Sequence, residues 1–71
     1  MKLKVKLYTK QNCYTIYEGN KEMCVGKING QNVKEIIESM VTFQTLNQKI
    51  TSISLENSYS YGITIYEVEV K

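Results

Sequence analysis

Apolar and polar residues alternate strictly along residues 2–8, which have the sequence KLKVKLY. A period of two is typical of a strand that buries one face and exposes the other. A polar stretch over residues 9–12 follows, and the strand-like pattern resumes over residues 13–18. These segments predict an antiparallel hairpin in which Leu7 lies opposite Tyr14.

A second hairpin is predicted at Gly19-Asn20, because a glycine in the first loop position permits a type II′ turn. The third strand then covers residues 22–26. Closing the hairpin on this loop predicts the pairs Ile16 with Met23 and Tyr14 with Val25. The apolar side chains of these predicted pairs then fall on one face of all three strands. This agreement between the turn residues and the apolar pattern supports the register.

The opposite face of these strands carries lysines and tyrosines. The candidate binding residues on it are Lys4, Lys6, Tyr8 and Tyr17. The same register places Cys24 on this face beside Lys6, and roughly 7–8 Å from Cys13 along the diagonal. That separation is longer than a disulfide favours, so we expect two free thiols.

A helix is predicted to begin after Asn32. Asn32 and Glu35 have the spacing of a capping box, in which the asparagine side chain accepts from a backbone N–H and the glutamate reaches back. Apolar residues then recur at helical spacing and predict the side turned toward the sheet: Val33, Ile36, Ile37, Met40 and Phe43. We expect one continuous helix that ends between Gln44 and Gln48.

The last third of the chain predicts another hairpin. Residues 51–56 alternate, residues 57–60 are typical of a loop, and residues 61–70 form a long strand. The elements together predict a single α+β domain over residues 1–71. Its architecture is a five-stranded, mainly antiparallel sheet with one helix packed on one face, in the order β-β-β-α-β-β.

The phase of the last strand is ambiguous. Ile63 and Ile65 favour one face, whereas Tyr66, Val68 and Val70 favour the other. Two interpretations stay open. Either a β-bulge lies near Tyr66, or the strand is covered on both sides at its end. The second makes Tyr66, Val68 and Val70 a candidate binding strand.

The charge and the length of the chain reduce the number of function classes that fit it. The nine basic residues are all lysine, the seven acidic residues are all glutamate, and the net charge of +2 is too small to define a polyanion binder. No arginine is present to supply a planar fork for bidentate contacts with phosphate or guanine. A domain of 71 residues has a small core, which favours a partner chain such as a homodimer.

The sequence offers little for catalysis, because it contains no histidine, the most frequent general acid or base. Glu35 and Glu38 lie on the predicted outer side of the helix, and two cysteines alone do not make a zinc site. We therefore expect no enzyme activity, catalytic residue, metal or cofactor. Lysines near the start and the lack of a long apolar run predict a cytoplasmic protein with no membrane partner.

In size, composition and lack of catalytic residues, the chain is similar to the short proteins with which phages and plasmids bind and block a host protein, the anti-CRISPR class among them. Abundant Lys, Asn, Ile and Tyr without Pro or Trp is also typical of AT-rich coding sequence. The resemblance implies a small non-enzymatic protein-binding module whose partner is a host protein. Two alternatives stay open: a nucleic-acid-binding protein that uses the Lys/Tyr face, and a structural homo-oligomer subunit.

Overall fold

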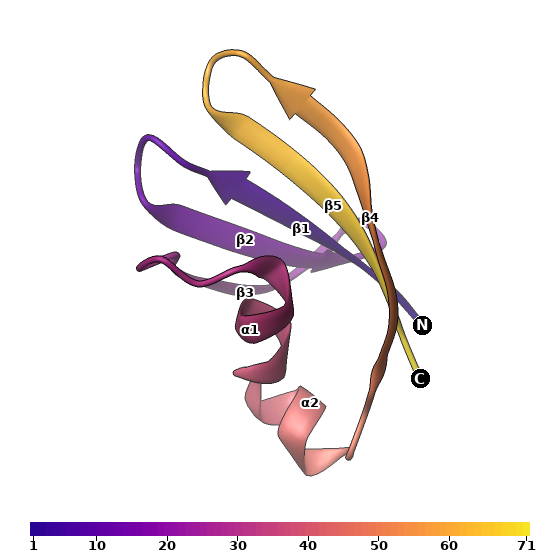
Figure 1. Ribbon diagram of the computed structural model, residues 1–71. Coiled ribbons are helices and arrows are strands. Elements are labelled where there is room, and N and C mark those ends of the chain that lie inside the picture. The colour runs from indigo at the N-terminus through magenta and orange to yellow at the C-terminus, as the bar shows by residue number, and fades with distance from the viewer.

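Five antiparallel strands form one sheet in the computed structural model, which describes residues 1–71, and two short helices connect the third strand to the fourth (Figure 1). The sheet order is β3-β2-β1-β5-β4. The strands are β1 (Lys2–Tyr8), β2 (Cys13–Glu18), β3 (Lys21–Lys27), β4 (Ile50–Tyr59) and β5 (Ile63–Val70), and the helices are α1 (Val33–Glu38) and α2 (Val41–Thr45). The α+β class and the five-stranded sheet are therefore confirmed.

The β1–β2 hairpin has the predicted register, with Leu7 opposite Tyr14. The next turn is also as expected, since Glu18 pairs with Lys21 across a two-residue loop. Gly19 has a φ of 62°, whereas Asn20 is not among the residues with positive φ. A type II′ turn requires this combination.

The predicted register of β3 is wrong beyond its first residues. Tyr17 pairs with Glu22, but Ile16 pairs with Cys24, so Met23 is the extra residue of a β-bulge. The insertion turns every later β3 side chain to the other face. Cys24 consequently lies on the apolar face, and Val25 is 61% exposed.

The bulge has a packing cause. It brings Gly26 opposite Tyr14, where the sequence pattern placed Val25. The Tyr14 ring occupies the space that any side chain at position 26 would need. A valine there could not be accommodated, whereas glycine leaves room for the ring.

Two short helices replace the one continuous helix that was predicted. The capping box at Asn32 is present, because the backbone N–H of each of Asn32 and Glu35 donates to the side chain of the other (3.0 and 2.9 Å). The helix stops at Ser39, whose hydroxyl donates to the carbonyl of Ile36 at 2.7 Å. Met40 is then extended, with ψ of 134°, before the chain turns into α2. The break rotates α2 while Met40 stays buried.

The β4–β5 hairpin is longer than predicted. Residues 57–59 belong to β4, so the loop shrinks to residues 60–62, where Gly62 has a φ of 93°. A three-residue hairpin loop favours a glycine in this left-handed conformation. No bulge lies in β5 near Tyr66; the irregularity is in β4, between Leu55 and Asn57.

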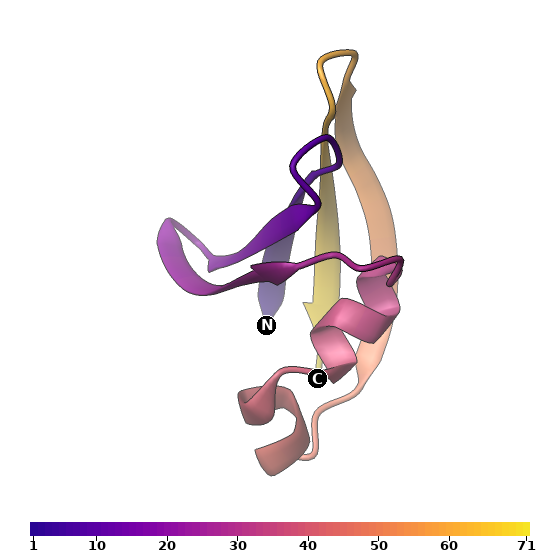
Figure 2. The same ribbon diagram turned by 90° about the vertical axis from the view of Figure 1, so that its left-hand side faces the viewer.

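One apolar cluster joins both helices to one sheet face. Its buried members are Leu3, Val5, Tyr14, Ile16, Val33, Ile36, Ile37, Met40, Phe43, Val68 and Val70. All five residues of the predicted helical stripe are among them. Both helices lie at one end of the molecule, away from the tip of the β4–β5 hairpin (Figures 1 and 2).

Candidate functional site

The sheet face opposite this core, here called the open face, is assembled in rows by the strand register. Residues directly opposite one another across neighbouring strands have Cβ atoms about 4.5–5.5 Å apart. Each row therefore behaves as a line of touching side chains. Three rows cross β1, β5 and β4 in the following order: Tyr8, Ile63, Tyr59; then Lys6, Ile65, Asn57; then Lys4, Glu67, Ser54.

The lysines nearest the start of β1 lie among glutamates. The Lys4 ammonium lies 3.3 Å from the carboxylate of Glu56, the residue inserted by the β4 bulge. Lys2 lies 3.8 Å from Glu67. These pairs are partly exposed and contribute little stability, but each places a negative charge beside a positive one. This half of the open face therefore has mixed charge.

Lys6 has a different environment. Its cross-strand neighbours are Thr15 and Ile65, neither of which is charged. Its ammonium lies 5.8 Å from the centre of the Tyr17 ring, within the range of a cation–π contact. Lys6 is thus the β1 lysine whose charge is held by an aromatic ring and not by a carboxylate.

The half of the open face toward the hairpin tip is aromatic and aliphatic. It contains the last row of paired residues before the loops, Tyr8, Ile63 and Tyr59, which we call the aromatic row. Tyr59 stacks on Tyr61 with ring centres 5.2 Å apart and accepts a hydrogen bond of 2.8 Å from the amide of Asn57. These contacts hold a tyrosine pair at the end of the row.

The tip is also fastened to the neighbouring turn. The carbonyl of Gly62 accepts hydrogen bonds from the backbone N–H of Thr9, at 2.9 Å, and from the Thr9 hydroxyl, at 3.1 Å. Both loops that flank the aromatic row are therefore bonded to each other. Such preorganisation lowers the entropy that is lost when the side chains contact a partner.

A shallow depression of ≈ 310 Å³ joins the two halves of the open face. Lys6, Tyr17 and Ile65 contribute to its lining, together with Lys4 and Glu56. The depression offers an apolar wall, an aromatic ring and charges of both signs. That combination suits a side chain of a protein partner better than a bare phosphate.

The structure brings together one set of predicted site residues. Lys4, Lys6 and Tyr17 are neighbours on the open face, and Tyr8 lies in the next row. Sequence reasoning did not identify Ile63, Ile65 and Tyr59 as companions of these residues. The signal was present in the alternation of Ile63 and Ile65, but their face depended on a pairing of β5 with β1 that no local pattern reveals.

The second predicted set lies elsewhere. β5 is an interior strand, paired with β1 on one side and β4 on the other. Val68 and Val70 are 0% and 1% exposed, and Tyr66 packs partly buried against the same core. These three residues therefore stabilise the fold and present no free strand edge, so they are not part of the candidate surface.

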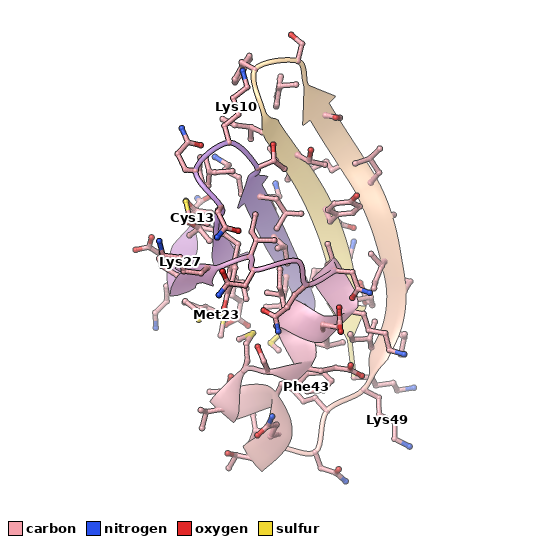
Figure 3. All side chains as sticks on the ribbon, turned by 60° about the vertical axis from the view of Figure 1, so that its left-hand side comes forward. Lys10, Cys13, Met23, Lys27, Phe43 and Lys49 are labelled. Atoms are coloured by element: carbon pink, nitrogen blue, oxygen red, sulfur yellow. The ribbon has the colours of Figure 1, made fainter.

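Both cysteines are free. Cys13 is on the open-face side, because it pairs with Tyr8, and Lys27 lies beside it (Figure 3), whereas Cys24 pairs with Ile16 on the core side. The two thiols are thus on opposite faces, which is a stronger obstacle to a disulfide than the diagonal spacing expected from sequence.

The phenol of Tyr14, on the core side, has a shifted pKa. Burial, and then the nearby Cys24, raise the pKa of Tyr14, while a hydrogen bond with Ser39 acts in the opposite direction.

No three or more side chains of histidine, cysteine, aspartate or glutamate gather closely enough to hold a metal ion. Neither helix has the length and apolar character to cross a bilayer. In comparisons with known proteins, no family model, curated protein or solved structure matches this chain. Its function is therefore inferred from the geometry of the chain alone.

Proposed function

We propose that this protein is a non-enzymatic protein-binding module that engages its partner through the open face, with the aromatic row at the centre of the contact. The observation that carries the proposal is the row itself. Tyr8, Ile63 and Tyr59 lie in register across three strands, on the sheet face opposite the core.

The chemistry of this surface fits protein recognition. Tyrosines are enriched at protein interfaces because each offers a large apolar ring and one polar hydroxyl group at low entropic cost. Tyrosine rings often carry much of the binding energy of an interface. Polar side chains flank this row on one side, where Lys6 and Asn57 lie in the next row.

Nucleic-acid binding is the second candidate function. It is favoured by the contact of Lys6 with Tyr17, since a strand-borne ring beside a cation can stack a base and approach a phosphate. The glutamates beside Lys2 and Lys4 count against it, because they offset the charge that a phosphate backbone would meet. The two functions differ in salt dependence, which is steep for phosphate contacts.

An inhibitory role in a phage or plasmid is part of the same proposal. A small module without catalytic groups can act on a host protein by occupying the surface which that protein needs. The identity of the retained partner tests this point, and a host defence protein would support it.

The experiment is affinity capture with the immobilised chain from nuclease-treated and untreated lysates of a low-GC bacterium. Three forms are compared: wild type, the double variant Tyr8→Ser/Tyr59→Ser, and the matched control Lys2→Gln/Glu67→Gln on the charged half. We expect a stoichiometric protein that survives nuclease, is bound at least about tenfold more weakly by the tyrosine variant, and is unaffected by the control substitutions.

Two results overturn the proposal. One is a set of partners that disappears after nuclease treatment, which would assign the face to nucleic acid. The other is equal capture by wild type and the tyrosine variant. Circular dichroism and urea unfolding of all three forms ensure that lost capture reflects a lost surface and not a lost fold.

A further inference from the structure

The two edge strands of the sheet are protected to different degrees. β3 carries three charged residues, Lys21, Glu22 and Lys27, which discourage pairing with another strand. β4 has ten residues and none with a charge from Ile50 to Leu55. An uncharged outer edge of this kind is a template for a further strand.

The hydrogen bonds of β5 show which way the β4 backbone points. Val70 and Met1 exchange backbone hydrogen bonds (2.8 and 2.9 Å), so even-numbered residues of β5 bond toward β1. Lys71 and Lys49 exchange bonds as well (2.8 and 2.9 Å), so odd-numbered residues bond toward the β4 side. This alternation is the normal pattern of an antiparallel ladder.

Ser54 pairs with Glu67, an odd-numbered residue, so the backbone groups of Ser54 face β5. Its neighbours Ile53 and Leu55 therefore direct their N–H and C=O groups outward, along the free edge. Their side chains lie on the core side of the sheet but remain 39% and 58% exposed, and neither belongs to the core cluster. Outward backbone groups and uncovered apolar side chains thus coincide at the same two residues.

We propose that this edge binds a second copy of the same chain, with the two β4 strands antiparallel about a twofold axis through Ser54. The inference is independent of the proposed function. In this register Ile53 of one copy forms a hydrogen-bonded pair with Leu55 of the other, and Leu55 with Ile53. An isologous interface must be self-complementary. The segment from Ile53 to Leu55 meets this requirement, because its two apolar residues pair with each other across the twofold axis.

The side chains of both faces agree with the register. On the core side, the two isoleucines and two leucines meet in one apolar cluster. On the open-face side, Ser52 lies opposite Glu56 of the other copy, so no like charges face each other. Shifting the pairing by two residues in one direction would place Leu55 opposite Thr51 and Ile53 opposite its own mate. The opposite shift would place Ile53 opposite Asn57 and Leu55 opposite its own mate. Each shift keeps one directly opposed apolar pair, whereas the proposed register has two.

The two β-bulges of β4 limit the contact to its centre. Register shifts lie between Ile50 and Ser52 and between Leu55 and Asn57. Bulges bend an edge and interrupt pairing. The dimer is therefore held by a short strand pair, and we expect an equilibrium between monomer and dimer that varies with concentration.

The first test is sedimentation equilibrium of the full chain over a range of concentrations. We expect a reversible dimer. Ile53→Lys places a charge at the apolar contact and should weaken the dimer at least about tenfold. The matched control is Val25→Lys, which introduces the same charge at an exposed valine of the other edge strand and should leave the dimer unchanged.

The second test reports the register. In a background of Cys13→Ser/Cys24→Ala, a cysteine in place of Ser54 would face its symmetry mate across a non-hydrogen-bonded pair, at about 4.5 Å between Cα atoms. That distance permits a disulfide. The substitution Ser52→Cys is the control, because its mates would be offset by about 14 Å along the strands at a rise of ~3.4 Å per residue.

The proposal predicts that mild oxidation crosslinks Ser54→Cys much faster than Ser52→Cys. It is overturned if wild type stays monomeric at every concentration, if Ile53→Lys dimerises as wild type does, or if the two cysteine variants crosslink at equal rates. Both readouts use variants at exposed positions, and their urea unfolding curves show whether each remains folded.

Discussion

The ring of Tyr14 lies over Gly26, so closely that a Cβ atom added at position 26 would come within 2.6 Å of the Tyr14 hydroxyl oxygen and 2.7 Å of the adjoining ring carbon. These two residues are partners in the β2–β3 register. The register of the edge strand β3 is therefore fixed by a single position without a side chain. The β-bulge at Met23 is what brings that position under the ring.

The variant Gly26→Ala should consequently destabilise the protein. The added methyl group must displace a ring that is itself packed in the core, and such overpacking costs about 1–3 kcal/mol. Urea unfolding measures the change. The control is Val25→Ala at the neighbouring exposed position, for which we expect a change within about 0.5 kcal/mol. Equal stability of Gly26→Ala and wild type would show that the ring can move aside.

Charge reversal should separate two lysines that look equivalent in the sequence. Lys4→Glu brings a carboxylate beside Glu56 and opposite Glu67, whereas Lys6→Glu meets no acidic neighbour in its row. Like charges on neighbouring strands are destabilising by roughly 0.2–1 kcal/mol. We expect both variants to fold and Lys4→Glu to be the less stable, by urea unfolding at low salt.

High salt provides the control for this comparison. At 1 M ionic strength the screening length falls to about 3 Å, so the difference between the two variants should shrink. A difference that persists unchanged would mean that packing, and not charge, distinguishes the two positions. Unfolding of both variants would mean that the lysines are not on the exposed side of β1.

Tyr14 should also make the fold sensitive to alkali. Burial and the neighbouring Cys24 raise the pKa of this phenol in the folded protein. The folded state therefore holds the proton more tightly than the unfolded state, whose phenol titrates near pH 10. The resulting contribution is complete below about pH 10 and is lost as the pH rises through the folded-state pKa.

Thermal unfolding from about pH 9 to about pH 11 measures this loss. The variant Tyr14→Phe lacks the ionisable group, so its melting temperature should decline less steeply over that range. Tyr61→Phe, at a tyrosine that is 59% exposed, should follow wild type. Parallel curves for Tyr14→Phe and wild type would contradict the assignment.

Local signals in the sequence were sufficient for much of the fold. The alternation of residues 2–8, the Gly19-Asn20 turn and the Asn32–Glu35 capping box each depend on contacts within a few residues. All three are present in the structure. Since each is decided by backbone geometry and neighbouring side chains, the pattern alone predicts it.

The bulges and the helix break could not be predicted in this way. An inserted residue such as Met23 or Glu56 is of a type that also occurs in regular strands, so the sequence does not reveal it. It nevertheless turns every later side chain of the strand to the opposite face of the sheet. Whether it occurs depends on packing from another strand, as Tyr14 shows at Gly26. The break at Ser39 similarly changes the direction of the chain so that α2 packs against the core. The helical spacing of the apolar residues does not reveal this break.

The part of the candidate site that depends on a local hairpin was predictable from the sequence. The part that depends on pairing between distant strands was not. Lys4 and Tyr17 come from a local hairpin, so their proximity followed from the turn. Ile63 and Tyr59 reach Tyr8 only through the pairing of β5 with β1 and β4. No short-range pattern specifies that pairing, and the aromatic row therefore became visible only in the folded chain.

The pairing of β1 with β5 has a consequence for synthesis. These strands lie side by side within the sheet, yet they come from opposite ends of the described chain. A polypeptide emerging from the ribosome cannot close this pair until β5 has been translated. Until then one side of β1 lacks its permanent neighbour, and closing so long a loop slows folding. The nascent chain therefore passes through a stage of translation in which an unpaired, partly apolar strand must be kept from premature association.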